Sequence, residues 1–160
     1  MTFSLAFVLI VAATAAAGLL AGASLDQSIK QLPARHKIGL VAYSEYSRAS
    51  DLGPGILWYA ILGVGAAVLT IAAAVAAFFE RVPPASAIPL YVAAGLAVLH
   101  SLVTTQAAPT NFSQRKVAED EAALARLFDR FERWQTLRAA LQVLSFGAML
   151  WALVAYASAS

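Results

Sequence analysis

The stretch that decides the fold is Gly55–Phe79, which reads GILWYAILGVGAAVLTIAAAVAAFF and contains no charged residue. A helix needs about 20 mainly apolar residues to cross roughly 30 Å of hydrocarbon, and this stretch is long enough. Its apolar residues run on continuously and do not alternate with polar ones, so the pattern favours a helix over a membrane β-strand. Gly53-Pro54-Gly55 and Val82-Pro83-Pro84, at its two ends, are typical of chain turns.

Three further uncharged windows extend the same pattern along the chain. The sequence therefore predicts four membrane spans near residues 3–25, 55–79, 88–108 and 137–157. The 160 residues are 61% hydrophobic and only 12% charged, whereas soluble domains carry about 25% charged residues. This composition excludes a soluble enzyme and a nucleic-acid-binding protein. We expect a single all-α domain, residues 1–160, built as an integral membrane four-helix bundle with a long cytoplasmic extension of its fourth helix.

The basic residues give these spans a direction. The connections 26–54 and 109–136 share one membrane face in any four-span chain, and with the start of the fourth span they hold ten of the eleven Lys and Arg residues; Arg81 alone lies on the other face. The positive-inside rule makes both connections cytoplasmic and places both termini outside, in a multi-pass protein of the cytoplasmic or plasma membrane. Ala21-Gly22-Ala23 resembles a signal-peptide cleavage site, but no Lys or Arg precedes the apolar run, which disfavours a cleaved leader.

Both cytoplasmic connections carry helical patterns. Residues 33–50 predict a short amphipathic helix at the interface, with Arg35, His36, Lys37 and Arg48 toward water. From Arg115 to Arg138 no proline interrupts the chain, and three charge pairs recur at i,i+4: Arg115–Glu119, Lys116–Asp120 and Asp129–Arg133. We therefore expect one long helix that begins at Arg115 in the cytoplasm and continues into the fourth span.

Polar and aromatic side chains on the last helix fall on one face. They recur at steps of three and four: Phe128, Phe131, Gln135, Arg138, Gln142 and Ser145. Arg138 and Gln142 reach into the apolar span, where an Arg near the end can snorkel to the interface. Two interpretations stay open: a snorkelling anchor with an interhelical hydrogen bond, or the lining of a polar pocket.

The third span aligns His100, Thr104, Ala108 and Asn111 in the same way. His100 is the only side chain within a span that titrates near neutral pH. It is a candidate general base, a candidate haem ligand, or a buried imidazole bonded to a neighbouring helix. The His and carboxylate residues lack the compact spacing of a metal site, and there is no cysteine, so we expect neither a metal nor another cofactor.

Other features of the spans have simpler explanations. Asp26 and Lys30 are spaced to pair with each other, although Asp26 as a counter-ion of Arg138 is an alternative. Gly18 and Gly22 form a GxxxG, which permits close helix packing and does not by itself indicate a dimer. Trp58 is either an interfacial belt residue or the wall of a pocket.

The layout resembles a known family. Pro109-Thr110-Asn111 ends the third span, and Phe131-Glu132-Arg133-Trp134-Gln135-Thr136-Leu137-Arg138 leads into the fourth. These residues, with Gly18-Leu19-Leu20-Ala21-Gly22, are similar to the anthrone-oxygenase-like family of small four-span membrane proteins, most of which form a domain of unknown function. The resemblance covers nearly the whole chain.

The resemblance implies an oxidoreductase of the monooxygenase type that oxidises a lipophilic phenolic anthrone with molecular oxygen and no metal or flavin. Asn111 and Arg138 carry over at matching positions, and His100 would be the base. Phe131 and Trp134 would stack on the substrate, with Thr104, Gln135 and Gln142 completing its binding site. Gln135 departs from the family, which often has His or Asn at this position, and Gln cannot act as a base. Phe131 stands where the family has a tryptophan.

A non-catalytic role is the alternative. The chain would then be a lipophile-binding or accessory membrane subunit, and its basic cytoplasmic helices would dock a partner protein or anionic lipid. The partners expected under either interpretation are the lipid bilayer, a lipophilic small molecule and a second copy or membrane partner protein, with no nucleic acid. A proton-coupled transporter ranks third because no carboxylate lies within a span.

Overall fold

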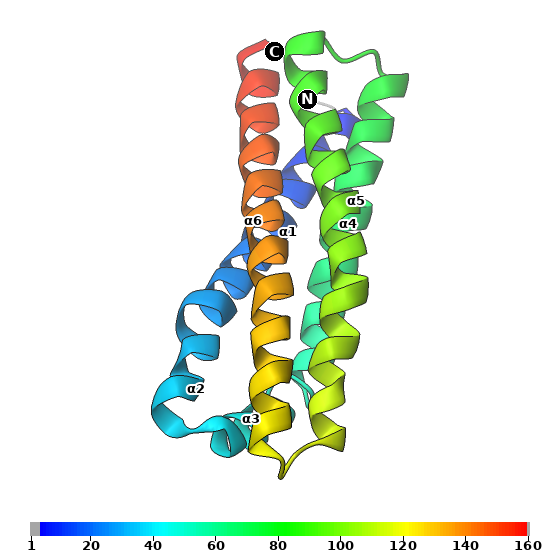
Figure 1. Cartoon of the computed structure of the whole chain (residues 1–160). Helices are drawn as coiled ribbons and strands as arrows, with labels where there is room; N and C mark the ends of the chain where they lie inside the picture. Colours follow the sequence, from blue (N-terminus) through cyan, green and yellow to red (C-terminus); the bar gives the residue numbers. More distant parts are fainter. Residues whose placement is uncertain (1–3, 160) are drawn as a thin grey trace.

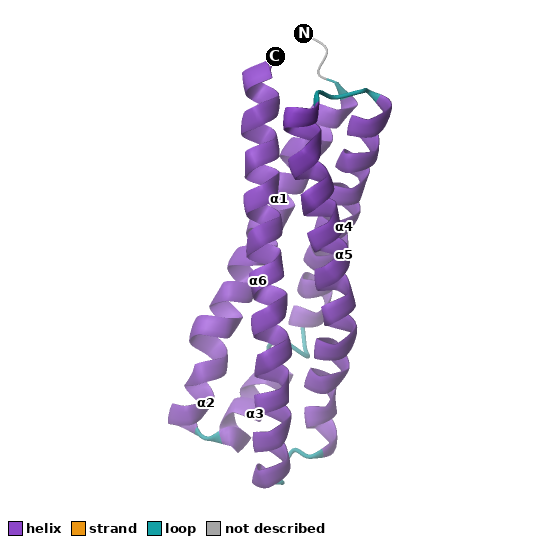
Figure 2. Cartoon of the chain, turned by 45° about the horizontal axis from the view of Figure 1, so that its top comes forward, coloured by secondary structure: helices purple, strands orange, loops and turns teal. Residues whose placement is uncertain are grey.

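The computed structural model describes residues 4–159, and they form an all-helical structure with no strand among them. Four long helices lie side by side and run alternately up and down, so that both ends of the described chain lie at the same end of the molecule (Figures 1 and 2). They are α1 (Leu5–Asp26), α4 (Gly55–Phe79), α5 (Pro84–Phe112) and α6 (Glu121–Ala159). All four are long and apolar enough to cross a membrane. The all-α prediction and the four apolar helices are confirmed.

Each long helix has two main neighbours. The α5–α6 pair makes the most extensive contact, followed by α1–α4 and α1–α6, and α4–α5 makes the least extensive of the four. α1 therefore lies diagonally opposite α5, and α4 opposite α6. This arrangement leaves a central space between the four helices whose filling differs from one end of the molecule to the other.

Small residues fill that space toward the termini. Ala13, Ala73, Ala93 and Ala152 are fully buried in one cluster with larger side chains, Ile10, Leu90 and Met149. Side chains of this size let helix backbones approach closely. In the GxxxG pair of α1 only Gly18 makes such an approach, because a Cβ there would lie 3.0 Å from the Phe146 ring, whereas a Cβ at Gly22 would meet nothing within 4 Å.

The turns flanking α4 follow the predicted punctuation. A Cβ on Gly53 would lie 2.5 Å from the Ala49 carbonyl oxygen, so the chain can turn this tightly only with glycine. At the other end Arg81 takes a φ of 54°, a left-handed conformation, before Pro83 and Pro84 start α5. The two turns bring α4 back alongside both of its neighbours.

The first connection differs from its prediction. α1 continues through a π-helical turn, Gln27–Gln31, into α2 (Leu32–Ile38), and α3 (Leu40–Ala49) follows after a break at Gly39, whose φ is 90°. The single short helix expected over 33–50 is thus two helices. Arg35 does not face water: it is 3% exposed. Its Nη2 pairs with Asp129 at 3.3 Å and Glu132 at 2.7 Å, so it fastens α2 to α6.

The second connection is also shorter as a helix than expected. α5 runs on to Phe112, a 3-10 turn covers Ser113–Lys116, and α6 begins only at Glu121. The Asp120 carboxylate accepts a hydrogen bond from the Ala123 N–H at 2.9 Å and so satisfies a donor of the first turn. The prediction of a helix from Arg115 is wrong because the chain has to reverse direction between α5 and α6. The third span is correspondingly longer than 88–108 at both ends.

Candidate functional site: a cavity between the helices

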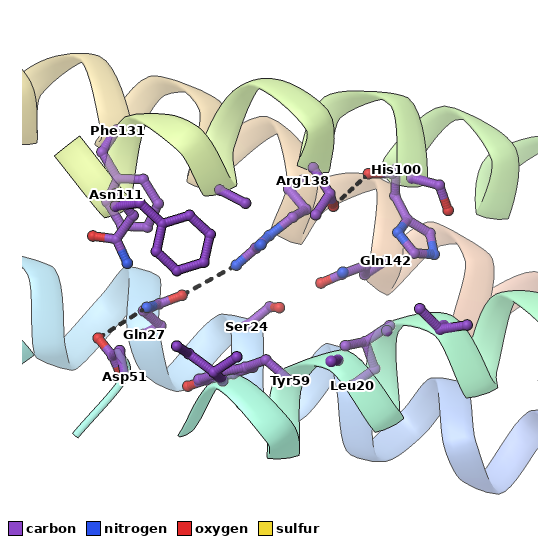
Figure 3. Close-up of a pocket in the computed structure, with 18 of the residues that line it drawn as sticks. Leu20, Ser24, Gln27, Asp51, Tyr59, His100, Asn111, Phe131, Arg138 and Gln142 are labelled. Atoms are coloured by element: carbon purple, nitrogen blue, oxygen red, sulfur yellow. Dashed lines mark hydrogen bonds between the residues drawn. The ribbon is translucent and has the colours of Figure 1, made fainter. Parts of the chain in front are cut away.

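A cavity of about 380 Å³ lies between all four long helices, at the end near α2 and α3. This volume falls within the range of small-molecule sites. Its walls are mostly apolar, and its polar side chains gather around Arg138 (Figure 3). Figure 3 shows Arg138 reaching across the cavity toward Gln27, with His100 and Gln142 on its other side.

Unpartnered polar atoms concentrate in this cavity. Seven buried side-chain N or O atoms of residues 4–159 lack a hydrogen-bond partner, and four of them belong to residues of the cavity wall: Ser24 Oγ, His100 Nδ1, Arg138 Nε and Gln142 Oε1. A buried polar group left unsatisfied costs about 1–3 kcal/mol. Four such groups around one hollow indicate a site built to receive polar atoms from another molecule.

Arg138 has no direct carboxylate partner among the described residues. Its Nη2 donates to Gln27 Oε1 at 3.2 Å, and Gln27 Nε2 in turn donates to Asp51 Oδ2 at 3.3 Å. Ser47 Oγ donates to the same oxygen at 3.1 Å. Burial raises the pKa of Asp51, and the hydrogen bonds from Ser47 and Gln27 and the positive charge of Arg138 oppose the rise only in part. The guanidinium therefore reaches its nearest counter-charge only through an amide.

A second set of hydrogen bonds supports the side of the cavity next to α3. The fully buried Gln114 donates from Nε2 to Asn111 Oδ1 at 2.9 Å and to Ser47 Oγ at 3.2 Å, and its Oε1 accepts from Ser44 Oγ at 3.1 Å. Through Ser47 this set joins the one that contains Asp51. Asn111 is thus held by its oxygen, which leaves its amide nitrogen as the group able to donate.

Six of the eight side chains predicted for the site line this cavity: His100, Thr104, Asn111, Phe131, Arg138 and Gln142. The Thr104 hydroxyl donates to the His100 carbonyl at 2.8 Å, so it can offer a ligand only its oxygen lone pairs. Two of the three expected catalytic residues, His100 and Arg138, carry unpartnered atoms. The alignment of polar residues on helix faces thus leads to one hollow.

The other two predicted residues lie elsewhere. Gln135 is fully buried against α1, where its Nε2 donates to the Ser24 carbonyl at 3.2 Å and to Ser28 Oγ at 3.3 Å. Trp134 packs on the cluster that contains Tyr43 and Phe128. Neither residue is part of the cavity wall, so any role in binding would be indirect.

Five polar members of the wall are not among the predicted site residues: Ser24, Gln27, Asp51, Tyr59 and Ser101. Asp51 lies in a predicted connection between spans. Its position could have indicated a site residue, because it comes directly before an apolar span and four residues after Ser47. Trp58, considered as a pocket wall, is 53% exposed, and its neighbour Tyr59 lines the cavity instead. Asp26 pairs with Lys30, as their spacing predicts. Asp26 is not the counter-ion of Arg138, which donates a hydrogen bond to Gln27 instead.

The wall combines a cation, an imidazole and amides at one end with apolar surface elsewhere. This combination can bind a lipophilic molecule by a hydrogen-bond-accepting end and can move a proton at His100. In the part of the chain that the structure describes, no three His, Asp or Glu side chains gather closely enough to hold a metal ion. No protein-family model matches the chain, and no curated protein and no solved structure matches it either.

Proposed function

We propose that this chain is a four-span membrane protein that binds a lipophilic small molecule in the cavity around Arg138. The observation that carries the proposal is the set of four unpartnered buried atoms at one end of an apolar hollow. A purely structural cavity would be lined by apolar groups or by polar groups bonded to one another. A ligand with an acceptor at one end would satisfy Arg138 Nε, and its remaining surface would lie against the apolar wall.

The outward surface of the helices supports membrane insertion. Large apolar side chains are exposed along their length, among them Val68, Val75, Leu144 and Val154, which are 49–63% exposed. Soluble monomers rarely expose a continuous apolar surface of this kind. The basic connections 26–54 and 109–136 lie together at the opposite end from the termini (Figure 1), which supports an orientation with the cavity near the cytoplasmic face.

The finer form of the proposal is a cofactor-independent oxygenase, as the family resemblance implies. His100 would remove a proton from the methylene carbon of an anthrone, and Arg138 with the Asn111 amide would bind the resulting enolate oxygen. The carbanion then gives two electrons to dioxygen and, with the proton returned, becomes a hydroperoxide. Loss of water from the hydroperoxide leaves the quinone carbonyl, so one anthrone and one O₂ yield one quinone and one water. The unpartnered His100 Nδ1 is what favours a catalytic role over simple binding.

The two histidines of the chain provide a matched test of this reaction. Purified protein in nanodiscs is given a hydroxylated anthrone, and quinone absorbance and oxygen uptake are followed for wild type, His100→Gln and His36→Gln. His36 is exposed and distant from the cavity wall. We expect turnover that His100→Gln lowers by about 100-fold, the usual range for a general base, and that His36→Gln leaves intact.

Two results would count against parts of the proposal. Equal turnover in both variants would remove His100 from the mechanism. Binding of the anthrone, seen as a rise in melting temperature that Arg138→Gln abolishes, without any turnover would reject the oxygenase and keep the lipophile-binding function.

A second candidate function rests on the outer face of α6. Arg35 holds Asp129 and Glu132, and none of the described residues forms an ion pair with Arg126 or Arg130. These two arginines line a shallow groove between α5 and α6 with Thr105, Thr110 and Ser113. This charge distribution favours an accessory role in which the groove docks anionic lipid headgroups. Loss of sedimentation with anionic vesicles in an Arg126→Gln/Arg130→Gln variant would support it.

A further inference from the structure

The cavity wall is not equally buried on all sides. Most wall residues from α1, from the turn that follows it and from α6 are closed off: Leu20, Ser24, Gln27, Phe131 and Gln142 are each at most 4% exposed, and Arg138 is half-buried. Wall residues contributed by α4 and α5 include strongly exposed ones: Ile56 is 40% exposed, Val64 64% and Phe112 42%. A side chain that both lines the hollow and meets the outside stands at its mouth. The mouth therefore lies between α4 and α5.

Two further features agree with an opening at this place. The α4–α5 contact is the least extensive among the four neighbouring helix pairs. Gly63, on the α4 side of the wall, faces open space, since a Cβ there would meet no atom within 4 Å. The four exposed wall residues at the mouth, Ile56, Ala60, Val64 and Phe112, are all apolar, so the opening presents mainly hydrocarbon to its surroundings.

The polar end of the cavity has a definite charge preference. Arg138 is the cation of the wall and meets no carboxylate oxygen directly, while Asp51, the only acidic residue of the wall, is occupied by Ser47 and Gln27. A ligand oxygen that carries negative charge would gain a charge-assisted hydrogen bond from the Arg138 guanidinium that a neutral ligand could not gain in full.

We propose that the cavity takes its ligand sideways from the cytoplasmic leaflet, through the gap between α4 and α5, and that this ligand is a lipophile ending in an anionic oxygen, bound at Arg138. The inference rests on the proposed lipophile-binding function, to which it adds the route by which the ligand enters and the charge of the ligand. A long-chain carboxylate and a lipophilic phenolate share this chemistry. The head lies against Arg138, His100 and Gln142, and the apolar body leaves through the mouth beside Val64.

The test uses a palmitic acid that carries a photoreactive diazirine, placed in the lipid of nanodiscs that contain the full chain, with its methyl ester as the neutral twin. Labelled positions are mapped by mass spectrometry. We expect the acid to label the cavity walls, Ile56–Val64 of α4 and Phe131–Gln142 of α6, about ten-fold more than the ester does, the factor that a hydrogen bond to a charged group provides. A lipophilic phenol with the same photoreactive group serves as a second arm, and labelling by one head group only identifies the source.

Matched variants separate the route from the site. Gly63→Leu narrows the mouth, whereas Gly65→Leu adds the same side chain on the same helix at a position that is equally open and is not part of the wall. We expect Gly63→Leu to slow labelling of α6 at least several-fold and Gly65→Leu to leave it unchanged. A soluble short-chain acid, benzoate, in excess in the aqueous phase should not compete. Arg138→Gln should remove the difference between acid and ester, and Arg138→Lys should restore part of it.

The outcomes are distinguishable. Full competition by benzoate, or equal labelling in Gly63→Leu and wild type while Arg138→Gln still lowers it, would overturn the lateral route and leave the proposed function standing. Equal labelling by acid and ester in wild type would overturn the anionic preference. Absence of any labelling of the cavity walls by acid, ester and phenol would contradict the proposed function itself.

Discussion

The two halves of the four-helix structure use the same helices in opposite ways. Toward the termini, alanines such as Ala73 and Ala93 close the space between the helices. Polar groups there are bonded, as in the Ser4–Tyr156 pair at 2.7 Å and the Thr14 hydroxyl on the Ile10 carbonyl at 2.7 Å, and among the described residues of this half only Ser86 Oγ is buried without a partner. Toward α2 and α3, longer side chains hold a hollow open, and six buried polar atoms stay unbonded, four of them in residues of the cavity wall. Packing is complete in one half and incomplete in the other, and the incomplete half has the arrangement expected of a functional site.

Enlarging one side chain in each half tests whether the two halves differ in packing. Ala73→Leu forces extra methyl groups into the closed half, where Ala73 is fully buried, and should lower the free energy of unfolding by about 1–3 kcal/mol. Gly63→Leu enters the hollow, where its Cβ meets nothing within 4 Å, and should change stability far less. Unfolding in mixed micelles measures both. Equal losses would show that the hollow is filled by the protein itself.

A second test replaces a buried amide by leucine at two positions, Gln142 in the cavity wall and Gln135 packed against α1. Gln142→Leu removes an oxygen that has no partner and should raise the free energy of unfolding by about 1 kcal/mol while weakening ligand binding. Gln135→Leu also removes an oxygen without a partner, but it loses the two hydrogen bonds that Nε2 donates to the Ser24 carbonyl and Ser28 Oγ. Their loss outweighs the gain, so the free energy of unfolding should fall by about the same amount. The opposite signs are the prediction, and a loss of stability in both variants would show that Gln142 is bonded in the folded protein.

A smaller effect concerns Asp51 and pH. Its pKa is raised in the folded protein above the ordinary 3.8, so the folded state binds this proton more tightly than the unfolded state. This carboxyl therefore makes folding less favourable as the pH rises from 3.8 through the raised pKa, and more favourable as the pH falls. Asp51→Asn should remove that part of the pH dependence, measured as melting temperature against pH in detergent. An unchanged profile would show that Asp51 titrates normally in the folded state.

The smallest predicted effect separates the two glycines of the GxxxG. Gly22→Ala meets no atom and gains helix propensity, so it should stabilise the protein by about 0.5–1 kcal/mol. Gly18→Ala brings a Cβ within 3.0 Å of the Phe146 ring, which must move aside, so most of that gain should be lost. A large destabilisation by Gly22→Ala, measured by unfolding in mixed micelles at several protein concentrations, would indicate that Gly22 packs against a second copy of the chain.

The elements that could be predicted are those determined by local sequence. Uncharged windows of span length define the four long helices, and helical spacing places His100, Thr104, Arg138 and Gln142 on faces that do meet. The start of α6 could not be predicted, because the reversal at residues 117–120 contains neither Gly nor Pro. Composition alone gave the helices but not which of their faces adjoin.

The remaining site residues depend on contacts between distant parts of the chain. Arg35 is buried because it forms ion pairs with Asp129 and Glu132, which lie more than ninety residues away in the sequence. Gln135 lies on the same stripe of α6 as Arg138 but one turn nearer the start of that helix, where α1 covers it instead of leaving a hollow. Which part of a polar stripe faces a cavity is decided by the neighbouring helices, and a single sequence does not contain that information.

A lipophilic ligand in the cavity around Arg138 should survive gentle purification. Wild type and Arg138→Gln are purified in mild detergent, and each is analysed by solvent extraction, mass analysis and an absorption spectrum. We expect a small lipophile bound in proportion to the wild-type protein and lost from the variant, with the helix content of the variant unchanged by circular dichroism. Identical extracts from both proteins, containing only bulk membrane lipid, would contradict the proposed ligand binding.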